Sequence, residues 1–370
     1  MLKASRIIAA MAMVSAAAPL GAKVRVDDPA TITGAIYIPS EAYNAPQMWK
    51  NFNAAEADRD LGYARKIDLN ALRVWASYEY WKMAPDRFQA NFDRFLAIAA
   101  KHHIRILISL FENDGEEPTP ANMWAADPVH GVDIKSPGDA IAKGPASGWE
   151  APRAFISWFM NRYRDNPNLL AIEVMNEPNP TRNGKIGSVP FAQSMLKTAK
   201  SLQGSVPLTI GSARIGQYAT FLPFGIDILE FHQNFPKDTA QMRHDIEAAM
   251  AIGKQVGKPV WLTEWQRTRP TATGFGKETI TAAERGPNYS SLAATVNGYP
   301  VATFFWSLMV KRAYLRPQRT KGTVNGLFWP DGSVVSANDA RAIADDPTLM
   351  IRERPMGTFG MEAASAGNGG

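Results

Sequence analysis

Two glutamates, Glu177 and Glu264, each end a short apolar run of the length expected for a buried parallel strand. Pro178 follows Glu177 directly and has no N–H to continue a sheet, so the first of these strands must stop there. The carboxyl ends of parallel strands are where α/β folds place their active sites. Two carboxylates brought to one rim can divide the work of glycoside cleavage: one protonates the leaving oxygen, and the other attacks or activates water.

The residues around the two glutamates favour a catalytic interpretation over a structural one. A single glutamate at a strand end is more often a surface or ion-paired carboxylate than a catalyst. Here there are two, and Asn176 directly precedes one of them. Trp306 ends a later apolar run and offers a flat apolar face to the C–H groups of a sugar. The combination indicates a carbohydrate site rather than two unrelated charges.

Eight apolar runs alternate with helical patterns along the chain. We expect strands at 31–38, 69–75, 104–110, 169–176, 206–210, 225–231, 258–264 and 301–306. We expect helices at 54–66, 85–102, 151–164, 191–202, 240–256 and 338–344. Eight such units predict an α/β fold, the closed (β/α)8 TIM barrel, whose closure brings both glutamates to one rim. No Gly-x-Gly-x-x-Gly pattern follows the first strand, so a dinucleotide-binding sheet has little support.

The two ends of the chain predict processing and disorder. Lys3 and Arg6 precede an apolar stretch at 7–20 and small residues at 21–22, the pattern of a secretory signal peptide. We therefore expect residues 1–22 to be removed and the protein to be periplasmic or secreted. Residues 23–361 would form one catalytic barrel, and the Gly/Ala/Ser-rich end at 362–370 a disordered tail. The segment 111–149 is long for a loop in a compact domain, so we expect it to be functional.

The composition excludes several classes of chemistry. The 370 residues include no cysteine, which rules out disulfides, thiolate metal ligands and a cysteine nucleophile. The net charge is +5, but the basic residues are scattered and form no stripe of the kind that binds nucleic acid. A mildly basic surface is the simpler interpretation, and a preference for an acidic glycan is the minority one. Later apolar runs are short, so the mature protein is expected to have no membrane-spanning segment.

The motifs at the strand ends resemble those of glycoside hydrolase clan A. The matching residues are Asn176-Glu177-Pro178 after the fourth predicted strand, Thr263-Glu264 after the seventh and Trp306 at the end of the eighth. The group nearest in shape is family 5, with its cellulases, mannanases and endo-1,4-β-xylanase-like relatives. The segments 69–75, 95–102, 231–232 and 329–332 fit the same relatives. The resemblance spans residues 31–345 and is specific for the clan but not for the substrate.

The resemblance implies a role for several of these residues. Glu177 would be the acid/base and Glu264 the nucleophile of a retaining mechanism, and Asn176 would bond the 2-hydroxyl of the sugar. Arg73 would lie beside Glu264 and keep it ionised, with a purely structural ion pair inside the barrel as the alternative. A general acid needs a raised pKa and a nucleophile must stay charged, so the two glutamates need different surroundings.

Other residues are candidates for substrate contact. His232 would orient the carboxylates or bind sugar, or else serve as a hydrogen-bonded packing residue. Trp306 would form the floor of the subsite next to the scissile bond. The further aromatic candidates, each of which alone is more often a packing residue than a sugar platform, are Tyr43, Trp49, Trp75 and Trp124.

Two positions depart from the family pattern. Relatives often carry a tyrosine two residues after the histidine of the sixth strand, where this chain has Asn234, which we take as a candidate substrate contact. The third strand ends in Leu110-Phe111-Glu112-Asn113 rather than in the histidine common in family 5. Glu173 shares a strand face with Glu177, and a buried carboxylate there needs a partner that the sequence leaves unnamed.

These observations predict a retaining glycoside hydrolase that cleaves a β-linked polysaccharide or oligosaccharide with two glutamates and needs no cofactor or metal. A transglycosylase with the same residues and a glycan-binding barrel that has lost turnover are the alternatives. A metal-dependent hydrolase has less support, since only His232 among the five histidines ends a strand. The sugar, the endo or exo mode and the oligomeric state stay open.

Overall fold

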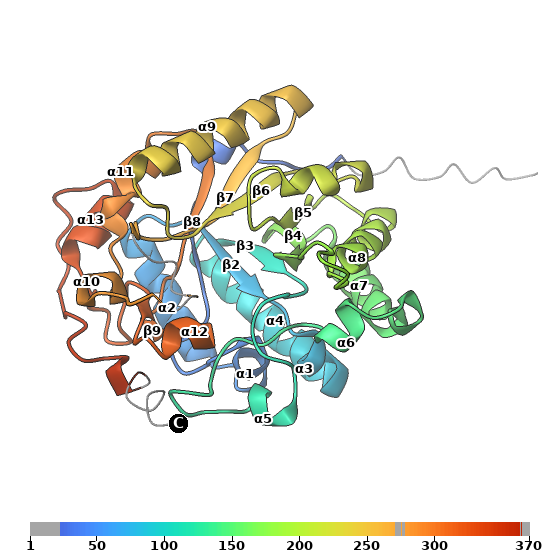
Figure 1. Cartoon of the computed structure of the whole chain (residues 1–370), viewed down its shortest axis with the longest axis horizontal. Coiled ribbons are helices and arrows are strands. Elements are labelled where there is room, and N and C mark those ends of the chain that lie inside the picture. Colours follow the sequence, from blue (N-terminus) through green and yellow to red (C-terminus); the bar gives the residue numbers. More distant parts are fainter. Residues whose placement is uncertain (1–22, 271–274, 276–277, 363, 365–370) are drawn as a thin grey trace, which may run out of the picture.

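A closed parallel barrel forms the centre of the molecule (Figure 1), as the computed structural model shows for residues 23–270, 275, 278–362 and 364. Hydrogen-bonded neighbours follow the order β5-β4-β3-β2-β1-β8-β7-β6. The strands are β1 Thr33–Ile36, β2 Ala71–Trp75, β3 Arg105–Ser109, β4 Leu169–Asn176, β5 Leu208–Gly211, β6 Leu229–Gln233, β7 Val260–Trp265 and β8 Ala302–Phe305. The predicted (β/α)8 barrel is confirmed.

The seam between β5 and β6 is closed by bonds at both of its ends. The amide of Asp227 donates to the carbonyl of Leu208 at 2.8 Å, and the amide of His232 donates to the carbonyl of Ser212 at 2.9 Å. The second bond lies at the carboxyl edge of the sheet, next to the predicted site. Closure therefore fixes where His232 stands relative to the neighbouring strands.

Helices surround the barrel, and their ends follow the capping residues of the sequence (Figure 1). The larger helices are α2 Ala54–Lys66, α4 Pro85–Lys101, α7 Glu150–Tyr163, α8 Val189–Ser201, α9 Thr239–Val256 and α13 Ala337–Ala344. The side chain of Asn53 accepts from the first amides of α2, and that of Asp238 caps α9. Gly257 ends α9 in the left-handed conformation, at a φ of 66°, which glycine adopts without strain.

Short elements lie between the strands and the larger helices. The short helices are α1 Ala45–Lys50, α3 Tyr78–Met83, α5 Pro120–Met123, α6 Asp139–Ala142, α10 Ala282–Arg285, α11 Ala293–Asn297 and α12 Arg316–Arg319. A small antiparallel pair joins β9 Lys311–Arg312 to β10 Val324–Asn325. The predicted loop 111–149 thus contains α5 and α6 rather than only irregular backbone.

Three sequence predictions differ from the structure or fall outside it. The sixth strand begins at Leu229 rather than at residue 225, because Leu222–Phe224 form a 3-10 turn and Gly225 ends it with a φ of 87°. The predicted signal peptide at 1–22 and most of the predicted tail at 362–370 lie outside the described residues. Among the helices that the structure does describe, none combines the length and apolar character needed to cross a membrane.

The buried carboxylate of Asp60, on α2, makes the stability of the fold depend on pH. This carboxylate accepts from the Tyr37 hydroxyl at 3.2 Å and from Arg59 at 2.7 and 2.8 Å. Burial raises the pKa of Asp60 to about 7, although Arg59 opposes the shift. A folded-state pKa above the ordinary value stabilises the fold fully below pH 3.8, and this contribution is lost as the pH rises through about 7.

As the pH rises from 4 to 7, we therefore expect the unfolding free energy of the Asp60→Asn variant to fall less than that of the natural protein. Asparagine keeps an acceptor for Tyr37 and carries no charge to desolvate. Urea unfolding, followed by circular dichroism at several pH values, measures the slope for each protein. Identical slopes in the two proteins would contradict the expectation.

Candidate active site

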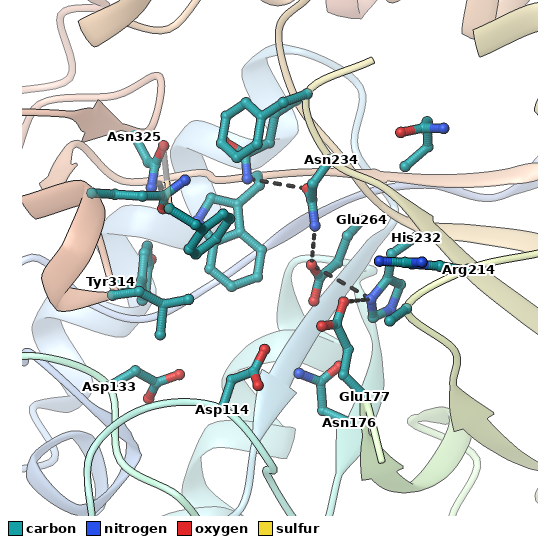
Figure 2. Close-up of a pocket in the computed structure, with 18 of the residues that line it drawn as sticks. Asp114, Asp133, Asn176, Glu177, Arg214, His232, Asn234, Glu264, Tyr314 and Asn325 are labelled. Carbon is teal, nitrogen blue, oxygen red and sulfur yellow. Dashed lines mark hydrogen bonds and ion pairs between the residues drawn. The ribbon is translucent and has the colours of Figure 1, made fainter. Parts of the chain in front are cut away.

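A cavity of ≈ 590 Å³ opens at the carboxyl ends of the barrel strands. Its lining includes both predicted glutamates, together with Asn176, His232 and Asn234. Figure 2 shows Glu177, Glu264 and His232 converging at one place, with Asp114 next to them and Asp133 farther along the same side. The barrel has brought the ends of β4, β6 and β7 to one rim, as the strand pattern predicts.

Glu177 follows β4 in an unusual backbone conformation. Its φ is 42°, in the left-handed region that residues other than glycine rarely adopt. The amide of Glu177 donates to the carbonyl of Gly211 at 2.8 Å, and Pro178 then ends the strand. Non-glycine residues adopt this strained conformation only where the surrounding structure holds them in it, and such residues cluster at functional sites. Here the conformation places the carboxylate against His232, whose Nδ1 lies 2.5 Å from Oε1 of Glu177.

Glu264 is held from two sides at the end of β7. Nη1 of Arg73 donates to Oε1 at 2.6 Å, and the amide of Asn234 donates to Oε2 at 2.8 Å. Nδ1 of His232 lies 3.6 Å from Oε2 of Glu264. Both oxygens of Glu264 therefore have donors, which fixes the orientation of the carboxylate and leaves it without rotational freedom.

The two glutamates lie close together. Single ligand atoms of Glu177, His232 and Glu264 all fall within 4.8 Å of one another. Retaining glycosidases separate their carboxyl groups by roughly 5–5.5 Å, whereas inverting enzymes leave roughly 6.5–9.5 Å for a water molecule. The spacing matches the short arrangement, in which one carboxylate attacks the sugar directly.

Arg73 is the centre of a fully buried charge network. Its guanidinium donates to both oxygens of Glu173, at 2.6 and 2.7 Å, and to the side-chain oxygen of Asn176 at 2.7 Å, in addition to Glu264. The Ser109 hydroxyl donates to Glu173 at 2.9 Å. The partner that the sequence left unnamed for Glu173 is therefore Arg73. Burial raises the pKa of Glu173 to about 8, although the charge of Arg73 opposes that shift.

Asn176 is bonded through both ends of its amide. Its oxygen accepts from Arg73, and its nitrogen donates to both oxygens of Glu112 at 2.9 Å. A bond from Asn176 to a sugar hydroxyl would have to be shared with the Glu112 carboxylate. The role that the resemblance implies for Asn176 stays a prediction.

His232 lies between carboxylates on both of its ring nitrogens. Nδ1 contacts Glu177, and Nε2 lies 3.9 Å from Oε1 of Glu230, a fully buried residue that is also 3.7 Å from Arg73. Burial would lower the pKa of His232, but the charges of Glu264, Glu177 and Glu230 raise it to about 10. The pKa of Glu230 falls to about 2 because His232 and Arg73 outweigh its burial. At neutral pH the ring is therefore an imidazolium that donates to Glu177.

The cavity contains four acidic residues that were not predicted as site residues: Glu112, Asp114, Asp133 and Asp245. Burial raises the pKa of Asp114 well above its ordinary value, and the neighbouring charge of Glu177 adds to the shift. Burial also raises the pKa of Asp133 to about 7. Glu112 and Asp114 directly follow the third strand, so the rule that located Glu177 could have found them. Asp133 lies within the long loop, where the sequence carries no comparable signal.

Comparisons with known proteins identify the fold. No protein-family profile matches the sequence. A mannan endo-1,4-beta-mannosidase 2 from Oryza sativa subsp. japonica is 26% identical over 170 residues, which is 40% of this chain and only 37% of that protein. An exo-beta-1,4-mannosidase from Opitutaceae bacterium strain TAV5 has a TM-score of 0.62 at 14% identity, over 87% of this chain and 61% of that one. The GH5_18 protein from Streptomyces cattleya, in complex with GlcNAc, has a TM-score of 0.57 at 12% identity, over 88% and 83%.

The chain has the fold of the family 5 glycoside hydrolases. The resemblance drawn from the strand-end motifs is therefore supported at the level of the fold. Glu177 and Glu264 stand at the strand ends where that resemblance expects them, and Asn234 takes the place of the expected tyrosine. Asn234 contacts Glu264 through its amide, a bond that a tyrosine hydroxyl could also supply.

Within this family 5 fold, the predicted aromatic contacts separate into three groups. Trp306 lines the cavity, with the ring of Tyr314 edge-on at 4.7 Å between centroids. Trp75 lies beneath Arg73, whose guanidinium is 4.6 Å from the ring centre, and it is buried. Trp49 is fully buried between barrel and helices, while Tyr43 and Trp124 line a different cavity. Trp306 is thus the aromatic candidate whose position fits a sugar beside the two glutamates.

Glu177, His232 and Glu264 are also spaced closely enough to surround a metal ion. Two observations oppose that use. The raised pKa of His232 keeps a proton on Nδ1, where a metal would need a lone pair. The guanidinium of Arg73 already lies 2.6 Å from Glu264 and would repel a second cation. The three side chains fit proton transfer better than metal binding.

Replacing Glu230 with glutamine tests the charge on His232. Glutamine keeps the size of the side chain but removes an anion 3.9 Å from Nε2, so we expect the pKa of His232 to fall by roughly one unit or more from about 10. A pH titration of the ring by nuclear magnetic resonance measures the shift. The same substitution at Glu247, on α9, serves as the control and should leave His232 unchanged. An equal titration curve in both variants would show that Glu230 has no influence on the ring.

Proposed function

We propose that the protein is a retaining glycoside hydrolase that cleaves β-1,4-linked glycans containing mannose. The observation that carries the proposal is the pair formed by Glu177 and Glu264, with ligand atoms within 4.8 Å at the rim of the barrel. The sugar is suggested by the proteins that this chain is similar to. They include an endo-1,4-beta-mannanase from Thermotoga petrophila and a GH5_18 variant from Streptomyces cattleya in complex with Manb1-4GlcNAc.

The two glutamates divide the first chemical step. Glu264 is fixed by Arg73 and Asn234, and its carboxylate attacks the anomeric carbon to form a glycosyl ester. Glu177 gives its proton to the glycosidic oxygen as the bond to the leaving sugar breaks. In the second step, water attacks the anomeric carbon, the bond between that carbon and Glu264 breaks, and Glu177 takes the proton of the water. The product has the same anomeric configuration as the substrate, and Glu264 returns to its carboxylate form.

The proton for the first step is shared between Glu177 and Asp114. Burial would raise the pKa of Glu177, but its hydrogen bond with the charged His232 lowers it, while the pKa of Asp114 is raised. The opposite directions of these two shifts favour the proton on Asp114 over Glu177 in the resting protein. A sugar that fills the cavity removes water from Glu177, which favours the protonated form of that carboxyl and draws the proton across.

Hydrolysis of matched hexasaccharides tests the substrate and the stereochemistry together. We expect β-1,4-mannohexaose to be cleaved faster than cellohexaose or xylohexaose, and the first reducing end detected by proton nuclear magnetic resonance to be the β-anomer. The positions of cleavage distinguish endo from exo action. A first product of α configuration would contradict retention, and faster cleavage of the glucose or xylose oligomer would contradict the mannose assignment.

Two outcomes of the same experiment would select an alternative function. Products longer than the substrate would indicate transglycosylation, in which a second sugar replaces water as the acceptor. Binding of the oligosaccharides without any cleavage would indicate a glycan-binding barrel. The double variant Glu177→Gln, Glu264→Gln is the control for contaminating hydrolases, since it should leave every oligosaccharide intact.

We also propose that the protein is exported, on the basis of the signal-peptide pattern at residues 1–22. Export would place the enzyme where polymeric glycans are available. Sequencing the amino terminus of the protein recovered from the periplasm or the culture medium tests the proposal. A start at residue 23 would support it, and a chain that keeps Met1 in the cytoplasm would contradict it.

A further inference from the structure

A second cavity, of ≈ 660 Å³, lies beside the barrel and contains neither of the two glutamates. Its walls come from the loop after β1, from α1, from β9 and from the segment near the carboxyl end of the chain. The side chains of Asn44 and Gln47 bond to the carbonyl of Met123, so α1 and α5 are fixed side by side at its edge (Figure 1). The cavity is therefore a built feature of the fold rather than a gap between mobile loops.

Aromatic rings and basic side chains alternate along the walls of this basic cavity. The ammonium of Lys50 lies 3.9 Å from the ring centre of Trp124. The guanidinium of Arg354 lies 4.6 Å from the ring centre of Trp329, and that of Arg312 lies 4.4 Å from that of Phe359. Tyr43 supplies a further ring. Such walls offer flat apolar faces to sugar C–H groups and positive charge at the edge of each face.

The charge of this basic cavity is opposite to that of the catalytic cleft. Its lining includes Lys50, Lys311, Arg312 and Arg354, and Glu41 is the one acidic residue among the described residues that line it. The cleft with Glu177 is instead lined by several carboxylates. A neutral polysaccharide carries no charge that would favour one cavity over the other. The charge of an anionic sugar favours the basic cavity.

Lys311 is a buried cation that forms no ion pair with any described carboxylate, although the charges of Glu56, Glu41 and Asp60 act on it from farther away. It is 5% exposed, and its ammonium donates to the carbonyls of Pro39 at 2.8 Å, Ser40 at 3.2 Å and Ala42. Within the described part of the chain no carboxylate approaches it to ion-pair distance. Burial and the charge of Arg319 lower the pKa of Lys311 to about 7. A buried charge is costly without a counter-charge, and an anion entering the cavity would provide one.

The other cations differ in how far they are already neutralised. Arg312 pairs with Glu362, and Arg354 lies 3.7 Å from Asp331, which it shares with Arg352 at 2.9 Å. Lys50 forms no ion pair with any described residue, and its ammonium lies over the ring of Trp124. After the internal pairs are counted, positive charge therefore remains at Lys50, and at Lys311 when the pH is below about 7.

We propose that this basic cavity binds a sugar residue that carries a carboxylate, such as a uronic acid unit of a glycan. The carboxylate lies between Lys50 and Lys311, and the sugar ring packs against the aromatic wall of Trp124 and Tyr43. The site acts apart from the catalytic cleft and does not require that the cleft cleaves mannan. It would hold an acidic part of a glycan while the cleft acts on a neutral part.

A matched pair of tetrasaccharides tests the proposal. β-1,4-mannuronate tetramer and β-1,4-mannotetraose differ only in the carboxylate at C6, and both are titrated calorimetrically into the full-length Glu264→Gln variant to prevent turnover. We expect Lys50→Ala to weaken binding of the mannuronate about tenfold and Trp124→Ala to weaken it by a similar factor, with mannotetraose unaffected. Raising the salt concentration should weaken the mannuronate selectively.

Lys197→Ala is the matched control, because it removes one positive charge from α8, which contributes nothing to the cavity. Lys311→Met provides a second test at the buried charge, and thermal unfolding shows whether that variant is folded. The proposal is overturned if the affinity for mannuronate is the same in Lys50→Ala as in Lys197→Ala. It is also overturned if acetate or inorganic phosphate binds as tightly as the tetrasaccharide, which would mean a site for simple anions only.

Discussion

The Glu264→Ala variant should lose β-glycoside hydrolysis by about 10³-fold or more in kcat, because the proposed mechanism forms the glycosyl ester on Glu264. Glu264 is oriented by Arg73 and Asn234, and its two oxygens accept bonds of 2.6 and 2.8 Å. Alanine removes the attacking oxygen and leaves both donors without their acceptor. Initial rates on mannohexaose, with thermal unfolding as the check of folding, measure the loss.

Azide separates a lost nucleophile from a damaged site. In the space left by the carboxylate, azide can attack the anomeric carbon of an activated aryl mannoside and give a glycosyl azide of inverted, α configuration. The Glu264→Gln variant, which keeps the volume of the side chain, should be equally inactive but should not accept azide. If Glu264→Ala kept activity within tenfold of the natural protein, Glu264 would not be the nucleophile.

The positions of the two glutamates could be predicted because each depends on a local signal. Pro178 ends a buried run, so Glu177 must stand at a strand end, and the run that stops at Glu264 is equally short. Barrel closure then requires no further information to bring the two together. The left-handed backbone of Glu177, with its φ of 42°, could not be predicted. Glycine or asparagine at a position suggests that conformation, and glutamate does not.

The charge network below the pair could be predicted only in part. Glu173 was expected to be buried and in need of a partner, and the structure supplies Arg73, two strands away. The burial of Glu230 could not be predicted. A single acidic residue in an apolar strand can equally point outward and reach solvent between the helices. The buried position of Glu230 follows from the register of β6 against β7, which pairs His232 with Glu264. Register between distant strands is a tertiary property that periodicity does not contain.

The aromatic residues show a similar limit. The sequence singled out Trp306 as the floor of a sugar subsite and offered Tyr43 and Trp124 as weaker candidates, and of these three Trp306 is the one that lines the cavity with the glutamates. Tyr43 and Trp124 come from the β1 loop and the long loop, and the way those loops fold together creates the second cavity. The sequence could not show that these aromatic residues belong to two different cavities.

Replacing Glu177 with alanine should lower kcat by roughly 10²–10⁴-fold on substrates whose leaving group is a sugar, the range expected for loss of a general acid. The effect should depend on the leaving group, because a dinitrophenolate departs without a proton and a sugar alkoxide does not. Rates on mannohexaose and on 2,4-dinitrophenyl β-mannoside measure both cases. The activated substrate should form its glycosyl ester at a nearly natural rate and then stall, since water at the ester lacks its base.

The stalled ester distinguishes the role of Glu177 from that of its neighbour. Azide needs no base, so it should release the sugar from Glu177→Ala as the β-azide, the opposite configuration to that expected for Glu264→Ala. Asp114→Asn is the informative comparison, because it removes the carboxyl that shares a proton with Glu177 but leaves Glu177 bonded to His232 at 2.5 Å. It should shift the pH dependence of kcat/KM without creating an azide product. If Asp114→Asn gave the β-azide and Glu177→Ala did not, the proton donor would be Asp114, and the hydrogen bond from His232 would serve to keep Glu177 ionised instead.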